Sequence, residues 1–113
     1  MKMKFFNPEQ DPEMVGVDYK LMYKLDLARQ MADIPFVITS GLRSIEKNKE
    51  IGGASDSSHL KGLAVDIACE NSQQAFCIIK GAFMAGFERI GLGKGHIHLD
   101  TDPIKTQKVL FVE

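Results

Sequence analysis

Two short segments with strict two-residue alternation restrict the folds open to this chain. The first, GLAVDIA at residues 62–68, alternates branched apolar residues with small ones and with Asp66. The second, HIHLD at residues 96–100, alternates apolar residues with His96, His98 and an aspartate. Because successive side chains of a strand point to opposite faces, each segment is predicted to be a strand with one apolar and one polar face.

Asp66 needs a partner, because an ionised carboxylate is costly to bury in an apolar strand without one. One possibility is a structural salt bridge with Arg43 or Lys61. The small residues beside Asp66, glycine and alanine, leave open space on its face, although Gly62 by itself is also consistent with a β-bulge. The pattern therefore allows either a purely structural ion pair or a site built around the carboxylate.

The three histidines of the chain all lie next to these strands. If the strands pair, His59, Asp66, His96 and His98 gather on one face of the sheet. Two imidazoles and a carboxylate are a common zinc-binding set, and three protein ligands leave the fourth position for water, as in catalytic sites. Imidazole ligands favour zinc over magnesium. The alternative is that the histidines only make hydrogen bonds at strand ends.

The rest of the chain predicts a mixture of helices and short strands. A helix is expected over residues 17–32, with Asp18 as its N-cap, and a short one is expected from residue 44 until the Gly52-Gly53 pair stops it. A third is expected over residues 72–84, capped by Ser72. Short strands are expected at residues 36–38 and 108–113 and around a glycine-rich turn at residues 91–95. The apolar face of the third helix is predicted to comprise Ala75, Phe76, Ile79 and Phe83.

These elements predict one α+β domain over residues 1–113, with an antiparallel sheet and helices packed on one of its faces. The net charge of −1 gives no reason to expect a nucleic-acid partner. The first apolar stretch ends at Asn7, which is too early for a signal-peptide core, and no run is long enough to insert in a membrane. We expect a monomer with free thiols at Cys69 and Cys77, a disulfide between them being the alternative.

Three motifs together resemble the M15 zinc peptidases. SSHLKGLAVD at residues 57–66 fits S-x-H-x-x-G-x-A-x-D, HIH at residues 96–98 fits a downstream H-x-H, and SGLRS at residues 40–44 is similar to an upstream S-G-x-R-S. The family includes D-alanyl-D-alanine carboxypeptidases and the L-alanyl-D-glutamate endopeptidases used as phage endolysins. The hedgehog signalling domain shares its fold. The similarity spans roughly residues 37–100.

The resemblance implies a role for individual residues. By position, His59, Asp66 and His98 would bind one zinc ion. Arg43 matches an arginine near the metal that contacts substrate or the developing oxyanion, a role that suits a planar, permanently charged guanidinium. Ser57, the first residue of the ten-residue motif, is a candidate substrate contact, although loop serines commonly make local turns.

The proton-transfer residue is less well defined by the resemblance. Many family members carry an acidic residue three positions before the last zinc ligand, where this chain has Gly95. His96 is expected beside the metal, as a base or as a cation that stabilises the tetrahedral intermediate. Asp100 lies on the same face and is a candidate to orient a histidine. Glu88 is a further acidic candidate whose position matches no motif.

The sequence therefore predicts a zinc peptidase that cleaves the peptide part of bacterial peptidoglycan, by carboxypeptidase or endopeptidase action. A phage-type lysis enzyme is the expected setting: made in the cytoplasm, it would reach the cell wall through a separate hole-forming protein or in a virion. The alternative is a zinc-binding interaction domain of the same fold without catalytic activity, which the glycine at position 95 keeps open.

Overall fold

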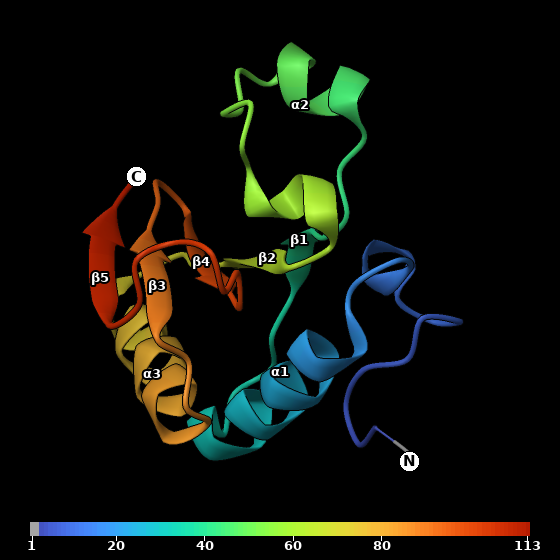
Figure 1. The fold of residues 1–113 in the computed structure, drawn as a ribbon. Helices are drawn as coiled ribbons and strands as arrows, with labels where there is room; N and C mark the ends of the chain where they lie inside the picture. Colours follow the sequence, from blue (N-terminus) through green and yellow to red (C-terminus); the bar gives the residue numbers. More distant parts are fainter. Residues whose placement is uncertain (1–2) are drawn as a thin grey trace.

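The computed structural model describes residues 3–113 and has an α+β fold. Figure 1 shows helices on both sides of a central sheet, with α1 and α3 on one side and α2 on the other. The elements follow the chain in this order: η1 (Pro12–Met14), α1 (Tyr19–Ala32), β1 (Ile38–Ser40), α2 (Ile45–Glu50), η2 (Ser58–Lys61), β2 (Ala64–Ala68), α3 (Ser72–Met84), β3 (Arg89–Leu92), β4 (His96–Asp100) and β5 (Val109–Val112).

The five strands form one sheet in the order β1-β2-β4-β3-β5. The first four pair in antiparallel fashion, as the sequence predicted. The edge strand β5 instead runs parallel to β3. The reason is topological: the chain leaves β4, passes through residues 101–108 and crosses to the far side of β3, so it enters β5 in the direction opposite to β4.

The core lies between the sheet and the two long helices. Asp18 caps α1 as predicted, accepting hydrogen bonds from the backbone N–H groups of Lys20 and Leu21. Helix α3 approaches α1 closely because Gly81 has no side chain: a Cβ there would collide with the backbone oxygen of Ala28. The buried side chains at the centre come from both helices and three strands: Leu21, Leu25, Val65, Ile67, Ile78, Ile90, Ile97 and Leu99.

Helix α3 has the predicted bounds but differs in its cap and its buried face. Asn71, rather than Ser72, supplies the capping oxygen, which accepts from the N–H of Gln74. The prediction that Phe76 and Phe83 face the core is wrong, because their exposed fractions are 69% and 59%. The side of α3 that contains Gly81 turns inward, since small residues allow the two helices to pack closely.

The segment before β2 is more ordered than the predicted polar loop. His59 lies in the 3-10 helix η2, which Ser57 caps by accepting from the N–H of His59. Gly62 ends η2 with a left-handed φ of 71°, so β2 begins at Ala64, two residues later than predicted. A side chain at Gly62 would be strained and would also meet the backbone oxygen of Gly16.

Two further expectations concern the chain as a whole. Within residues 3–113, no helix combines the length and the apolar character needed to cross a bilayer. Cys69 and Cys77 are both free thiols, as expected.

Candidate metal centre

The register of β2 against β4 creates the polar face of the site. Asp66 stands directly opposite His98, and the neighbouring pair Ile67 and Ile97 points to the core. The alternation of the two segments therefore produces the two-faced sheet that the sequence predicted. Arg43 and His59 reach the same face from the segments that follow β1 and precede β2.

Three side chains converge on one point of this face. The Nε2 atom of His59 and the Nδ1 atom of His98 each lie 3.2 Å from Oδ1 of Asp66. All three residues are buried, and their ligand atoms lie within 4.8 Å of one another. Ligand atoms in a tetrahedral zinc shell are about 3.3 Å apart, given metal–ligand bonds of about 2.0–2.1 Å. The donor set and its spacing therefore fit a zinc ion.

The remaining ring nitrogens of both histidines are occupied by outer partners. Nδ1 of His59 lies 2.9 Å from the backbone oxygen of Gly41, and Nε2 of His98 lies 2.6 Å from Oδ2 of Asp100. If these nitrogens carry the protons, the other nitrogen of each ring faces Asp66 as a lone-pair donor. Such outer partners fix the ring and its tautomer in metal sites, which is the orienting role predicted for Asp100.

The electrostatics of the cluster strongly favour its charged forms. Burial alone would raise the pKa of Asp66, but hydrogen bonds with His59 and His98 outweigh it and hold the pKa well below its ordinary value. Burial opposes the charged form of His98, yet hydrogen bonds with Asp100 and Asp66 raise the pKa of His98 to about 9. The pKa of Asp100 is lowered in the same way as that of Asp66. The site is therefore suited to hold a cation, a proton or a metal.

Arg43 lies over the carboxylate of Asp66 in a fixed position. One guanidinium nitrogen is 3.7 Å from Oδ2 of Asp66 and donates to the hydroxyl of Ser40, and the other donates to Oδ1 of the buried Asn48 at 3.0 Å. Asp66 thus has an arginine neighbour as well as its two histidines. Lys61, the other suggested partner, pairs with Asp102 instead, at 3.0 Å.

The serines of the motif have structural contacts. Ser57 lines the cavity over the site, but its hydroxyl caps η2. Ser58 is buried and donates to Oδ2 of Asp102 at 2.8 Å. Because Lys61 binds the same oxygen, Asp102 ties η2 to the segment that follows β4. This tie holds His59 against β2.

His96 lies at the rim of the site and has a partner that the sequence analysis missed. Its Nε2 atom is 3.0 Å from Oε1 of Glu113, and its ring packs so closely on Gly93 that a Cβ there would overlap it. The alternation of KVLFVE places Phe111 and Glu113 on one face of β5. This alternation was the sequence signal that could have indicated Glu113 as a residue of the site. Glu88, the acidic residue considered from the sequence, is exposed and does not line the cavity.

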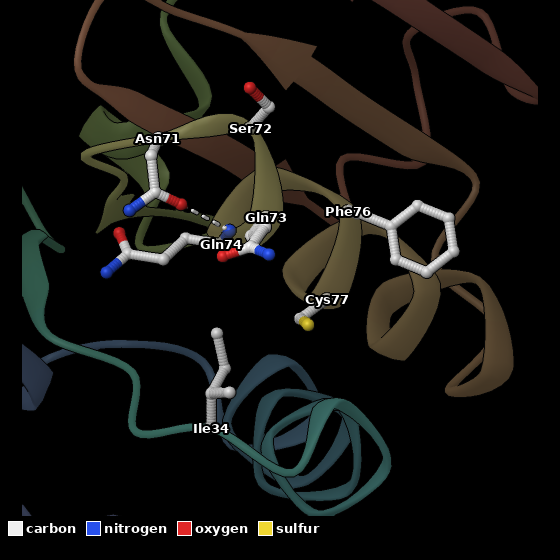
Figure 2. A pocket seen from close by; sticks show the side chains of 7 residues that line it. All are labelled: Ile34, Asn71, Ser72, Gln73, Gln74, Phe76 and Cys77. Carbon is white, nitrogen blue, oxygen red and sulfur yellow. Dashed lines mark hydrogen bonds between the residues drawn. The ribbon is translucent and has the colours of Figure 1, made fainter.

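A cavity of about 370 Å³ lies over the candidate metal centre and is lined by polar and charged side chains, Arg43, His96 and Glu113 among them. A larger hollow of about 590 Å³ lies elsewhere, between Ile34 and the first turns of α3. Figure 2 shows that amide side chains, Cys77 and Phe76 surround that second hollow. Its lining residues include no histidine or carboxylate, so the chemistry concentrates in the smaller cavity.

Comparison with known proteins finds a family model and a curated relative that match this chain. Residues 3–100 match the protein-family model described as Peptidase M15. The chain is 39% identical over 77 residues to the zinc D-Ala-D-Ala carboxypeptidase of Streptomyces albus G, an alignment that covers 66% of this chain and 29% of that protein. The chain thus spans less than a third of the length of this relative.

The fold also resembles a solved structure. The crystal structure of the Serratia marcescens L-Ala D-Glu endopeptidase ChiX matches with a TM-score of 0.61 and 24% identity, covering 88% of this chain and 92% of that chain. This second likeness is one of fold. The family match extends from the N-terminal segment to the end of β4 and so includes all three converging side chains. On that match, this chain belongs to the Peptidase M15 family.

Proposed function

We propose that this protein is a zinc-dependent peptidase that hydrolyses a peptide bond in the stem or cross-link peptide of bacterial peptidoglycan. One observation carries the proposal: His59 and His98 converge on Asp66 at the base of a cavity that also holds Arg43. The family supports the reaction class. The relatives, by their names a D-Ala-D-Ala carboxypeptidase and an L-Ala D-Glu endopeptidase, support the substrate class.

In this proposal His59, Asp66 and His98 hold one zinc ion. When bound, zinc polarises a carbonyl oxygen and activates water for attack near neutral pH. The protein contributes the orientation of the ligands: Gly41 holds the ring of His59 and Asp100 holds the ring of His98. Burial of the three side chains limits the access of competing solvent and strengthens their interaction with a cation.

Arg43 and His96 act on the substrate side. The guanidinium of Arg43, held by Asn48 and Ser40, offers a planar fork of donors to a substrate carboxylate or to the oxyanion that develops at the scissile carbonyl. His96, on the same face of β4 as His98, is proposed to stabilise or move charge there. Ser57 lines the cavity and is proposed to contact the substrate through its exposed atoms.

The reaction and the scissile bond are tested together by mass spectrometry of fragments released from defined peptidoglycan peptides. We expect zinc-dependent release of either a terminal D-alanine or an internal fragment cut at the L-Ala–D-Glu bond. A parallel sample with a chelator should release neither. Release of the same fragments in the chelator, by protein shown to be metal-free, would contradict a zinc mechanism.

The alternative function is a zinc-binding interaction domain without turnover. The observation that favours it is Gly95, a residue without a side chain at the end of the turn before β4. In that case zinc-loaded protein would retain its metal and release no new amino groups from any of the peptides. Release of amino groups at a rate proportional to bound zinc would exclude it.

The cellular setting in the proposal is a phage-type lysis or virion-associated enzyme that acts as a monomer. It is tested by expressing the protein in bacteria with and without a separate pore-forming protein. We expect lysis only when the pore is also made. Lysis by the protein alone would contradict this route to the wall.

A further inference from the structure

Three carboxylates line the cavity over the metal centre, and two of them already have several partners. Asp66 is surrounded by His59, His98 and Arg43. Asp100 is buried and binds Nε2 of His98, Nε of Arg89 and the backbone N–H of Asp102. These contacts leave neither group available for a new proton.

Glu113 is the third carboxylate, and it differs from the other two. Its Oε1 atom contacts Nε2 of His96 at 3.0 Å. Within residues 3–113, no other hydrogen bond or ion pair to its side chain is found. Its side chain lines the cavity and is 37% exposed, so solvent reaches the carboxylate.

The backbone of β5 sets the position of Glu113. The N–H of Glu113 donates to the backbone oxygen of Leu92 at 2.9 Å, which extends the pairing of β5 with β3 by one residue. Phe111, two residues earlier, packs edge-on against the His98 ring with centroids 5.7 Å apart. Because alternate residues of a strand share a face, this contact fixes the register that turns Glu113 toward His96.

The distance to the metal centre is short. Single ligand atoms of Asp66, His96 and Glu113 lie within 4.8 Å of one another. A carboxylate oxygen this close to an oxygen of Asp66 would be near a metal ion if Asp66, His59 and His98 held one. Among the carboxylates that line the cavity, Glu113 thus combines a position close to Asp66 with a single side-chain partner within residues 3–113.

We propose that Glu113 is the proton acceptor of the hydrolytic reaction and that His96 holds its carboxylate in place. The inference rests on the proposed peptidase function. The oxygen of a water molecule forms a bond with the scissile carbonyl carbon while one of its protons passes to Glu113. That proton then passes to the amide nitrogen as the C–N bond breaks, which yields a carboxylic acid and an amine and restores Glu113.

The proton acceptor would then come from the end of β5. In the sheet, β3 lies between β5 and β4, the strand that carries His98. This explains how Gly95 can precede the ligand strand without loss of a proton acceptor. It also assigns a task to His96 that needs no metal contact: its Nε2 atom is engaged by Glu113.

The test compares Glu113→Gln with Glu88→Gln, a matched change at an exposed carboxylate outside the cavity. Chelator competition measures zinc affinity. Turnover is measured with the peptidoglycan peptide that the wild-type protein cleaves. For Glu113→Gln we expect unchanged zinc affinity, a KM close to that of the wild type and a kcat at least about a hundredfold lower. Glu88→Gln should match the wild type in all three.

A second variant separates lost chemistry from lost structure. Glu113→Ala removes the carboxylate and leaves space for a small replacement, so added formate should restore part of its turnover, whereas Glu113→Gln should not respond. Turnover of Glu113→Gln equal to that of Glu88→Gln would overturn the inference. So would loss of zinc from Glu113→Gln, which would make Glu113 a ligand. Absence of turnover in the zinc-loaded wild type would instead overturn the proposed function itself, and this inference with it.

Discussion

His98 is held by Asp100 through a contact of 2.6 Å between Nε2 and Oδ2. The two residues are on the same face of β4, two positions apart, so the strand itself brings them together. This contact leaves Nδ1 of His98 directed at Asp66. The ligand geometry of the proposed zinc site therefore depends on a carboxylate that does not itself face the ion.

Replacing Asp100 by Asn tests this dependence. The amide keeps the size of the side chain but loses the charge that strengthens His98 as a ligand, so we expect zinc affinity to fall by about 10–100-fold. Asp56→Asn, at an exposed loop position, is the matched control and should bind zinc like the wild type. Chelator competition measures both, and an Asp100→Asn affinity equal to the control would show that Asp100 does not support the site.

Replacing Arg43 tests the proposed substrate-side cation. Arg43→Ala should lower kcat/KM by about a hundredfold, the scale of one lost oxyanion donor. Arg43→Lys should recover only part of that loss, because an ammonium lacks the planar fork that Asn48 and Ser40 now hold. Thermal unfolding serves as the control for folding. A variant that unfolds near the wild-type temperature and hydrolyses peptide at the wild-type rate would make Arg43 a structural residue only.

The metal-free protein should lose stability as the pH rises above neutrality. Burial opposes the charge on His98, but Asp100 and Asp66 raise its pKa from an ordinary 6.5 to about 9 in the folded protein. A group whose pKa is higher in the folded than in the unfolded protein stabilises the fold. This contribution is complete below the unfolded pKa and is lost as the pH rises through the folded pKa. Thermal unfolding in a chelator should therefore show a midpoint that falls between about pH 6.5 and pH 9.

At acidic pH the unfolding midpoint should change in the opposite direction, falling as the pH falls. The pKa values of Asp66 and Asp100 are lowered in the folded protein, so their contribution is present above an ordinary pKa of 3.8 and is lost as the pH falls below it. His98→Gln should abolish the alkaline decline while keeping part of the acidic one. A wild-type midpoint that stays constant from neutral pH to pH 9 would contradict the charged state of His98.

Asp102 should matter for stability rather than for zinc chemistry. It is fully buried and receives hydrogen bonds from Ser58 and Lys61. Asp102→Ala leaves the buried hydroxyl of Ser58 without its acceptor, and we expect the free energy of unfolding to fall by about 1–3 kcal/mol. Lys61→Met removes only a half-exposed ion-pair partner and should cost at most about 1 kcal/mol. Chemical denaturation measures both, and equal losses would contradict the buried tie.

The sequence predicted those parts of the site that depend on local alternation. Asp66 and His98 were placed on one face because a strand has a period of two, and their pairing followed once the two segments were taken as neighbours. The N-cap of α1 was also local, since Asp18 precedes its helix directly. The family motif then suggested roles for His59 and Arg43, whose positions depend on the irregular segments that precede β2 and follow β1.

The remaining features depend on contacts between distant segments. Nothing in KVLFVE indicates that β5 pairs in parallel with β3, so the approach of Glu113 to His96 was hidden although the alternation of β5 was visible. The exposed side of α3 was misassigned because Phe76 is apolar, whereas close packing against α1 selected the side that carries Gly81. The sequence allowed Lys61 as a partner for Asp66, but in the fold Lys61 pairs with Asp102 instead.

The most direct test of the account is the zinc content of three purified proteins, measured by elemental analysis after dialysis. The account predicts one zinc ion per chain in the wild type, one in His96→Ala, and none in His98→Ala. His96→Ala is the matched control, because both residues are histidines on the same face of β4. Full zinc content in His98→Ala would contradict the metal centre formed by His59, Asp66 and His98.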